Sequence, residues 1–449
     1  MGSCVAVLAC ELRQAALRMA DVGGGQRPTR AALRLERHAD RRQWHGDLQA
    51  RYAELVVRVG VNVQPGQEVV IRGLVEHAPV ARAIARQAYL AGARRVTVEY
   101  DDLHVQHAAA ELGPEDWLGR TPEHVLAGIR GWVESKPAVI RLTGNPEPQL
   151  FADLDPTRVA RLDPKDQAAV RLPLLAANVV TWTVAAAPNP GWARVILGEP
   201  DLPSLWRAVA AATRLDETDP VAAWRAHVAR LQTRASTLER YGFDAIRFRG
   251  TGTDLTVGLL GGCRWLGGSQ TSSSGIDFVP NLPTEEVFTS PDRRRAEGTV
   301  RVSYPFVVPG SNAFVRGLQL RLAGGRVVEV TADEGAEAIR EQLASEPNAA
   351  HLGEVALVDG SSRVRGTGLV FRDTLFDENA GSHIAYGQAF PGALDAAAGK
   401  NAHDLLALGL NVASLHTDMV IGGPEVNVDG LDRSGQPTPI IRDDTWVLP

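Results

Sequence analysis

The sequence has few of the features that mark secreted, membrane or disulfide-bonded proteins. It holds only three cysteines, Cys4, Cys10 and Cys263, among 449 residues. These cannot build a disulfide framework and offer no C-x-x-C pair for a metal. The longest apolar run, residues 172–187, is interrupted by proline and asparagine and is too short to cross a bilayer. Because the N-terminus also lacks a convincing export signal, we predict a cytoplasmic protein with no membrane partner.

Charge of one sign is not in excess either. Lysine and arginine total 47 against 53 aspartates and glutamates, which gives a formal net charge of −6. No general basic field is available to hold a phosphate backbone, so we expect no nucleic-acid partner. The hydrophobic fraction of 44% and the charged fraction of 22% are typical of a folded globular protein.

The length is too great for one small core and predicts two domains. Residues 1–48 are arginine-rich and lack periodic apolar positions, so we interpret them as a disordered or wrongly assigned N-terminal extension. Residues 49–240 are predicted to form an α/β domain with a parallel sheet. Residues 241–449 are predicted to form an α+β C-terminal domain, rich in antiparallel strands, that carries the metal site.

The α/β prediction depends on strands that alternate with a helix. Residues 68–72 and 96–100 are short runs rich in β-branched residues, and residues 79–90 between them have apolar positions at helical spacing. Strand, helix and strand at this spacing favour a βαβ unit and a parallel sheet. A third strand over residues 138–142 continues the theme, and a helix over 220–238 ends it at Tyr241-Gly242.

The second half alternates with a period of two residues. Its glycine-rich connections indicate hairpins and an antiparallel sheet. The predicted strands cover residues 245–249, 255–259, 299–304, 318–322 and 327–330. We also expect inserted helices near residues 334–343 and near residues 380–390.

No familiar catalytic motif is present. The sequence has no His-Glu-x-x-His pair, no Gly-x-Ser-x-Gly elbow, no Walker loop and no complete dinucleotide fingerprint. These absences exclude the helical zinc-protease arrangement and leave isolated oxygen and imidazole groups between residues 281 and 418 as the candidates.

Glu285 and Glu286 are adjacent carboxylates, and in an extended segment their side chains point to opposite faces. Glu354 is the single acid inside the apolar strand predicted over residues 352–358. A carboxylate in such a run is costly to bury unless it is paired or bound to a metal.

His383 follows Gly381 in a turn that we expect to open the helix near residues 380–390. His416 and Asp418 are two residues apart in a predicted strand and therefore face the same way. By composition alone, His351 or His403 would serve as well as either of these histidines.

Three carboxylates and two histidines form a ligand set suited to borderline or hard divalent ions. Carboxylates bridge, so such a set can hold two ions that activate water and polarise a carbonyl or phosphoryl group. A single residue of these types is more often a capped turn, a salt bridge or a surface acid than a metal ligand.

Four segments carry a stronger signal, namely residues 281–289, 352–358, 376–390 and 416–418. In order, residue type and approximate spacing, they resemble the thermophilic metalloaminopeptidase family, and the similarity extends from Tyr52 to the C-terminus. The resemblance implies an aminopeptidase that acts as a homodimer on peptides with a free N-terminus. It also implies two divalent ions per chain, of zinc, cobalt, manganese or magnesium.

Carried over by position, the resemblance implies that the metal ligands are Glu286, Glu354, His383, His416 and Asp418. Glu286 gives the better fit to the family spacing, so Glu285 then points away or supports the site from behind the ligands. We predict that Glu285 and Tyr386 are the catalytic residues.

One position departs from the family. A tyrosine expected seven residues after the first ligand histidine is replaced here by Phe390, which has no hydroxyl. On the predicted helix, Tyr386 lies three residues after His383 and offers a phenol from the same face. Together with the absence of export and membrane signals, the resemblance predicts a cytoplasmic metalloaminopeptidase. The alternatives are a catalytically weakened metal-binding homologue and a two-metal hydrolase of non-peptide amides.

Overall fold

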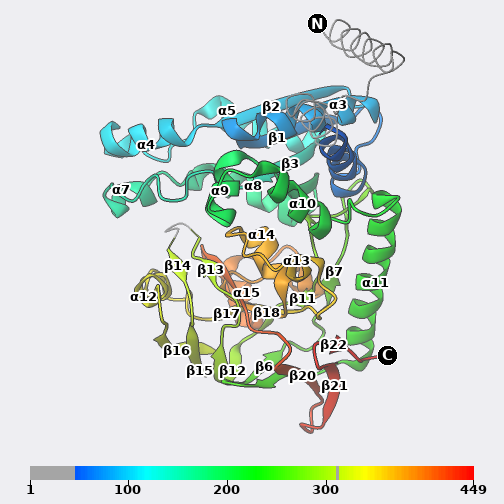
Figure 1. Cartoon of the computed structure of the whole chain (residues 1–449). Coiled ribbons are helices and arrows are strands. Elements are labelled where there is room, and N and C mark those ends of the chain that lie inside the picture. The colour runs from blue at the N-terminus through cyan, green and yellow to red at the C-terminus, as the bar shows by residue number, and fades with distance from the viewer. Residues whose placement is uncertain (1–45, 310–312) are drawn as a thin grey trace, which may run out of the picture. The chain divides into compact units, whose positions relative to one another are not determined.

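A computed structural model of the chain describes residues 46–309 and 313–449 (Figure 1). The extension predicted over residues 1–48 lies outside the described residues except for its last three positions. Leu48–Pro449 group as one unit, and the boundary expected near residue 240 stays a prediction.

The first half builds a parallel sheet of five strands. Its order is β10-β4-β3-β1-β2, with β1 (Glu68–Leu74), β2 (Arg95–Asp101), β3 (Ala138–Thr143), β4 (Thr181–Ala186) and β10 (Asn281–Leu282). Helix α3 (Ala78–Leu90) connects β1 to β2 and buries Val80, Ile84 and Ala88. The predicted βαβ unit is confirmed. The edge strand β10 comes from the second half of the chain, so this sheet also anchors the segment that precedes Glu285.

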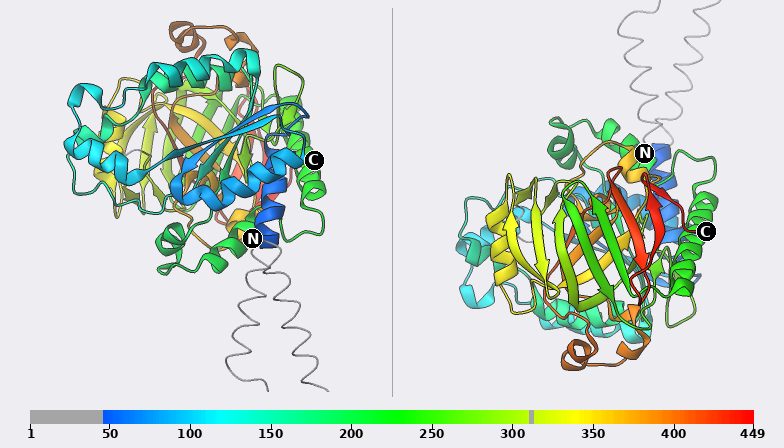
Figure 2. Two further views of the ribbon diagram at one scale, coloured as in Figure 1. Left: turned by 90° about the horizontal axis from the view of Figure 1, so that it is seen from above. Right: turned by 90° about the horizontal axis from the view of Figure 1, so that it is seen from below.

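The second half contains an antiparallel sheet of eight strands, seen face-on in the right panel of Figure 2. Its order is β16-β15-β12-β6-β5-β20-β21-β22. The strands are β5 (Ala245–Gly250), β6 (Thr253–Leu259), β12 (Pro291–Arg301), β15 (Gln319–Ala323), β16 (Arg326–Thr331), β20 (Val426–Leu431), β21 (Pro437–Arg442) and β22 (Thr445–Trp446). The predicted hairpins are present, but β12 begins and ends earlier than the strand expected over residues 299–304.

A second sheet of five strands, also antiparallel, packs on the eight-stranded sheet. Its order is β19-β18-β17-β11-β7, with β7 (Leu266–Gly267), β11 (Val287–Thr289), β17 (Leu352–Leu357), β18 (His383–Gly387) and β19 (His416–Val420). Ile384 and Met419 from this sheet share one apolar core with Phe248 and Val300 from the other. The core therefore covers one face of the second five-stranded sheet and leaves its opposite face for other groups.

Helix α11 (Pro220–Tyr241) contacts β7 and β11 at the edge of this sheet (Figure 1). Asp219 caps its N-terminus by accepting a hydrogen bond from the Ala222 amide, and Gly242 ends it with a φ of 59°. These caps confirm the predicted helix and its end. No helix in the described part of the chain is long and apolar enough to cross a membrane.

The other elements are short connections around these three sheets. The helices are α4 (Leu103–Leu112), α5 (Glu123–Arg130), α6 (Trp132–Ser135), α7 (Pro156–Ala160), α8 (Lys165–Ala176), α9 (Pro190–Leu197), α10 (Leu202–Ala212), α12 (Ala336–Ala344), α13 (Arg363–Gly366), α14 (Thr374–Asp377) and α15 (Ala402–Leu408). Two small hairpins pair β8 (Gln270–Thr271) with β9 (Asp277–Phe278) and β13 (Phe306–Val307) with β14 (Phe314–Val315).

The helix predicted near residues 380–390 is wrong. His383–Gly387 forms β18, which pairs with β17 on one side and β19 on the other. Every residue of this strand is buried, so it lacks the alternation of apolar and polar residues that reveals a half-exposed strand. The position of His383 in a strand changes which neighbouring side chains can share its site.

Candidate metal centre

The side chains predicted as metal ligands meet on one face of the second five-stranded sheet. They lie on its strands or directly before β11: Glu286, Glu354, His383, His416 and Asp418. Ala385 of β18 is paired with Glu354 on one side and with Asp418 on the other, while Gly387 is paired with His416. Paired residues of an antiparallel sheet share a face, as do residues two apart in a strand. The register therefore turns the four residues on β17, β18 and β19 to the same side.

Glu354 stands between two groups of potential ligands. His383 Nε2 lies 3.0 Å from Glu286 Oε2 and 3.7 Å from Glu354 Oε1. His416 Nε2 lies 3.1 Å from Glu354 Oε2 and 3.1 Å from Asp418 Oδ1. Within each group of three, the ligand atoms lie within 4.8 Å of one another. The two oxygens of Glu354 thus face different histidines, and this residue is the member common to both groups.

Both histidines turn the same nitrogen toward the carboxylates. His383 Nδ1 lies 3.2 Å from the carbonyl oxygen of Gly381, and His416 Nδ1 lies 2.8 Å from that of Gln388. An Nδ1–H that donates to a carbonyl leaves the Nε2 lone pair free to bind a metal. Glu286 Oε2 is buried, and the polar atom that faces it is His383 Nε2. A lone pair of His383 and this oxygen, 3.0 Å apart, are stable together only with a proton or a cation between them.

The electrostatics of the cluster favour the binding of positive charge. Burial raises the pKa of Glu286. Burial alone would lower the pKa of His383, but the carboxylates of Glu286 and Glu354 raise it well above its usual value. Burial would likewise lower the pKa of His416, and Asp418 and Glu354 reverse that shift. A divalent ion supplies the charge that these acids otherwise take from protons, so the donor set fits a metal.

Glu378 is a fourth acid at the cluster that the sequence did not single out. Burial and the charges of Asp418 and Glu286 raise its pKa well above the usual value. It lines a narrow pocket together with Asp418 and Tyr304. Its place five residues before His383, inside one of the four matching segments, was the only sequence signal that could have found it.

The prediction that Tyr386 shares a face with His383 is wrong. The two residues are three apart in a strand, so their side chains point to opposite faces. The Tyr386 hydroxyl donates a hydrogen bond to Gln342 Oε1 of α12, and Thr417 Oγ1 donates to the same oxygen at 2.9 Å. The ring is buried in the core between the two antiparallel sheets. The structure thus removes the helical argument for Tyr386 as an oxyanion donor.

Phe390 lies at the rim of the cluster. Its ring centroid is 5.2 Å from that of His416, in an edge-to-face arrangement, and it also packs against Phe288. It is 38% exposed. The position where the family resemblance expects a tyrosine is therefore next to a predicted metal ligand, while Tyr386 is on the far side of the sheet.

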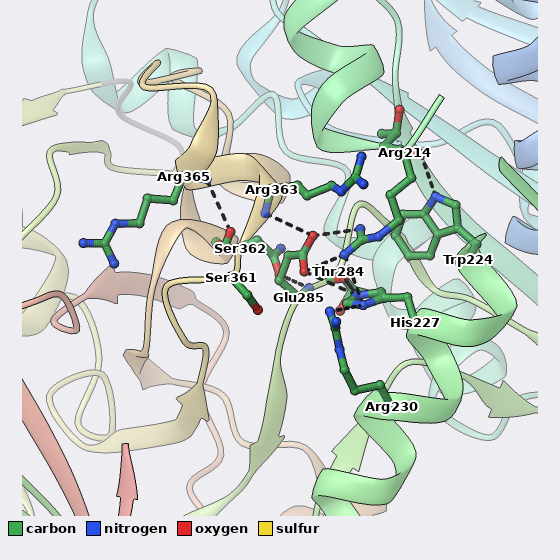
Figure 3. Close-up of polar contacts among 12 residues, drawn as sticks. Arg214, Trp224, His227, Arg230, Thr284, Glu285, Ser361, Ser362, Arg363 and Arg365 are labelled. Carbon is green, nitrogen blue, oxygen red and sulfur yellow. Dashed lines mark hydrogen bonds and ion pairs between the residues drawn. The ribbon is translucent and has the colours of Figure 1, made fainter. Parts of the chain in front are cut away.

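Glu285 faces away from the cluster into a separate network (Figure 3). Arg214 Nη1 lies 2.8 Å from Glu285 Oε1, and Arg214 Nη2 donates to Oε2 at 2.9 Å. Both side chains are buried, and the Glu285 amide donates to Asn379 Oδ1 at 2.6 Å. The prediction that Glu285 points away from the ligands agrees with this geometry, which offers no contact between its carboxylate and the cluster.

His227 holds the same segment from α11. Its Nε2–H donates to the carbonyl oxygen of Thr284 at 2.8 Å. Its Nδ1 accepts from Arg214 at 3.1 Å and from Arg230 at 2.8 Å, which requires a neutral ring. Burial and the charge of Arg214 lower the pKa of His227 to about 3. The sequence did not reveal Arg214 or His227, since they meet Glu285 only through tertiary packing.

Known proteins match most of this chain. The family model described as thermophilic metalloprotease (M29) matches residues 47–446. The chain belongs to this family. It is 41% identical over 406 residues to aminopeptidase T of Thermus aquaticus, which covers 89% of this chain and 98% of the relative. It is 35% identical over 412 residues to aminopeptidase 2 of Geobacillus stearothermophilus, covering 90% and 99%.

A solved structure agrees with the fold. The structure titled wild-type AmpT from Thermus thermophilus matches with a TM-score of 0.81 at 37% identity, covering 90% of this chain and 99% of that one. The resemblance predicted from sequence is confirmed, and so is the mixed α/β fold with parallel and antiparallel sheets. The chain is a metallopeptidase, and membership of this family implies a divalent metal.

Proposed function

We propose that this metallopeptidase is an aminopeptidase with two divalent ions, one in each of the two groups that share Glu354. The observation that carries the proposal is the position of the Glu354 carboxylate, with one oxygen toward His383 and the other toward His416. Relatives at 35–41% identity over about nine-tenths of the chain are aminopeptidases by name, which supports the choice of substrate.

Ions bound at such paired positions act as Lewis acids and lower the pKa of water, which makes hydroxide available at neutral pH. The chain's own residues set the geometry. The carbonyls of Gly381 and Gln388 orient the two imidazoles, and the buried strands keep the carboxylates in place. Glu378 stands outside both groups and lines the adjoining pocket with Asp418. With the ions bound, their charge would offset the acids that raise its pKa, and its carboxylate would then be placed to take the proton that water loses.

Two experiments test the proposal. Metal analysis of the purified protein should find close to two divalent ions per chain, and removing them should abolish peptidase activity. Amino-acid p-nitroanilides should be cleaved, whereas the same compounds with a blocked amino group should not. Full activity in demetallated protein would refute the metal requirement, and cleavage of blocked substrates would indicate a general amide hydrolase.

A weakened homologue is the second candidate, and Phe390 is the observation that favours it. Without a phenol at this position, the site has one donor fewer for the negative charge that develops on the carbonyl oxygen. Binding of two ions with no turnover of either substrate would support this candidate.

The remaining parts of the proposal concern the setting of the enzyme. We infer that zinc, cobalt, manganese or magnesium serves as the metal, because oxygen and imidazole ligands suit all four to different degrees. We also propose that the chain acts as a homodimer in the cytoplasm and that residues 241–449 form the domain that carries the metals.

A further inference from the structure

A cavity of about 250 Å³ lies beside the residues that hold Glu285, and Arg214 and His227 belong to both (Figure 3). Its lining is polar except for two small alanines of α11. The polar residues are Arg214, Glu217, His227, Arg230, Ser361 and Arg363. Three guanidinium groups and one carboxylate thus form the charged part of the wall.

Two of the three arginines are already neutralised. Arg214 is paired with the buried carboxylate of Glu285. Arg363 Nη1 lies 2.6 Å from Asp216 Oδ1, and its Nη2 contacts Glu217. Arg230 differs from them: Glu285 and Asp359 act on its charge, but no carboxylate of the described residues contacts it as an ion pair.

Arg230 is held in place by a neutral acceptor. Its Nη2 donates to His227 Nδ1 at 2.8 Å, and the pKa of His227, lowered to about 3 by burial and Arg214, keeps that nitrogen unprotonated at neutral pH. A guanidinium has five N–H donors, so this bond leaves four of them for another partner. Fixing one edge of Arg230 reduces the entropy lost when a ligand binds the other edge.

Arg363 approaches the same cavity from α13, whereas Arg230 approaches from α11 (Figure 3). Arg230 and Arg363 thus bring guanidinium groups from two separate elements to one cavity, and guanidinium groups are the usual donors to small oxyanions. We propose that this cavity binds a small oxyanion, of the phosphate or carboxylate class, with Arg230 as the main donor and Arg363 as the second. The site is separate from the metal centre, since Glu285 and Glu286 face different clusters.

The test uses inorganic phosphate and acetate as probes. Each is titrated calorimetrically into the metal-loaded protein at constant ionic strength, near pH 7.5, with wild type, Arg230→Gln and Arg225→Gln compared. Arg225 is exposed on the same helix and does not line the cavity, so it is the matched control for lost charge. Any binding to the metals is common to the three proteins and cancels in the comparison.

We expect Arg230→Gln to weaken the binding of at least one probe by about tenfold or more, the usual worth of a hydrogen bond to a charged group, with Arg225→Gln unchanged. Arg230→Lys should restore part of the affinity and shows that the loss follows the charge. Tighter phosphate binding identifies a phosphate ligand, and tighter acetate binding a carboxylate. Equal affinities in wild type and Arg230→Gln, or no binding of either probe, would overturn the proposal.

Discussion

Two buried polar clusters lie back to back across the adjacent glutamates 285 and 286, and their charges are balanced in different ways. On the first side, the permanently charged guanidinium of Arg214 binds Glu285 through both carboxylate oxygens. On the second, four acids surround two imidazoles: Glu286, Glu354, Glu378 and Asp418. No arginine or lysine of the described residues forms an ion pair with these four acids.

The difference shows what separates a structural acid from a metal ligand. Both glutamates are of the same type, adjacent in sequence and almost fully buried, at 3% and 5% exposed. Burial therefore does not distinguish them. The partner does, because Arg214 supplies a charge of its own while the histidines offer lone pairs that need a cation from solution.

The largest effect is expected on the side that lacks a fixed cation. Glu354→Ala removes the carboxylate shared by the two groups, so metal binding and activity should be lost together, with kcat/KM falling by at least about 10³-fold. Metal analysis and p-nitroanilide hydrolysis measure both losses. Glu341→Ala, at an exposed acid of α12, is the control and should change neither. Full metal content in Glu354→Ala would contradict the predicted sharing.

Changes at the Glu285–Arg214 pair should lower the free energy of unfolding and leave metal binding intact. Glu285→Gln keeps the shape of the side chain but leaves Arg214 buried without its counter-charge, and we expect the free energy of unfolding to fall by about 3–5 kcal/mol. Metal content per folded chain should be unchanged. Glu217→Gln removes a half-exposed partner of Arg363 and should cost no more than about 1 kcal/mol. Denaturant unfolding measures both, and loss of metal without loss of stability in Glu285→Gln would make it a ligand.

The sequence predicted one cluster much better than the other. Glu354 was visible because a lone acid in the apolar strand Leu352–Leu357 is costly unless it is paired or bound to a metal. His416 and Asp418 were predictable because side chains two residues apart in a strand point to the same face of the sheet. The Arg214 contact joins residues 71 positions apart and leaves no periodic or local pattern.

The fold shows the same contrast between elements with local sequence signals and elements without them. Strands with turn residues at their ends and the capped helix α11 were predicted, since their signals are local. β18 was not predicted, because a strand that is buried on both faces, preceded by Gly381 and ended by Gly387 resembles a short helix start in sequence. That error placed Tyr386 on the wrong side of the sheet.

A smaller effect is expected from adding a hydroxyl donor to the cluster of predicted metal ligands. Phe390→Tyr adds a hydroxyl beside His416, where the family resemblance expects one, and should raise kcat by up to about 10²-fold with little change in KM. Steady-state kinetics measure this separation. Phe151→Tyr, at a ring that packs on His107 in the first half, is the control and should be silent. An unchanged kcat would show that no phenol at this position takes part.

The smallest effect is expected at Tyr386, where the two faces of one strand are compared directly. Tyr386→Phe removes the hydrogen bond to Gln342 but keeps the buried ring, so stability should fall by about 1 kcal/mol while kcat stays unchanged. Thr417 lies between His416 and Asp418 in sequence and donates to the same Gln342 oxygen. Thr417→Val removes this second donor and should likewise lower stability without changing kcat. Both variants act on the face that packs against the eight-stranded sheet. A fall in kcat of about 10²-fold at constant stability in Tyr386→Phe, the scale of a lost oxyanion donor, would place its hydroxyl in the reaction and contradict the separation of the two faces.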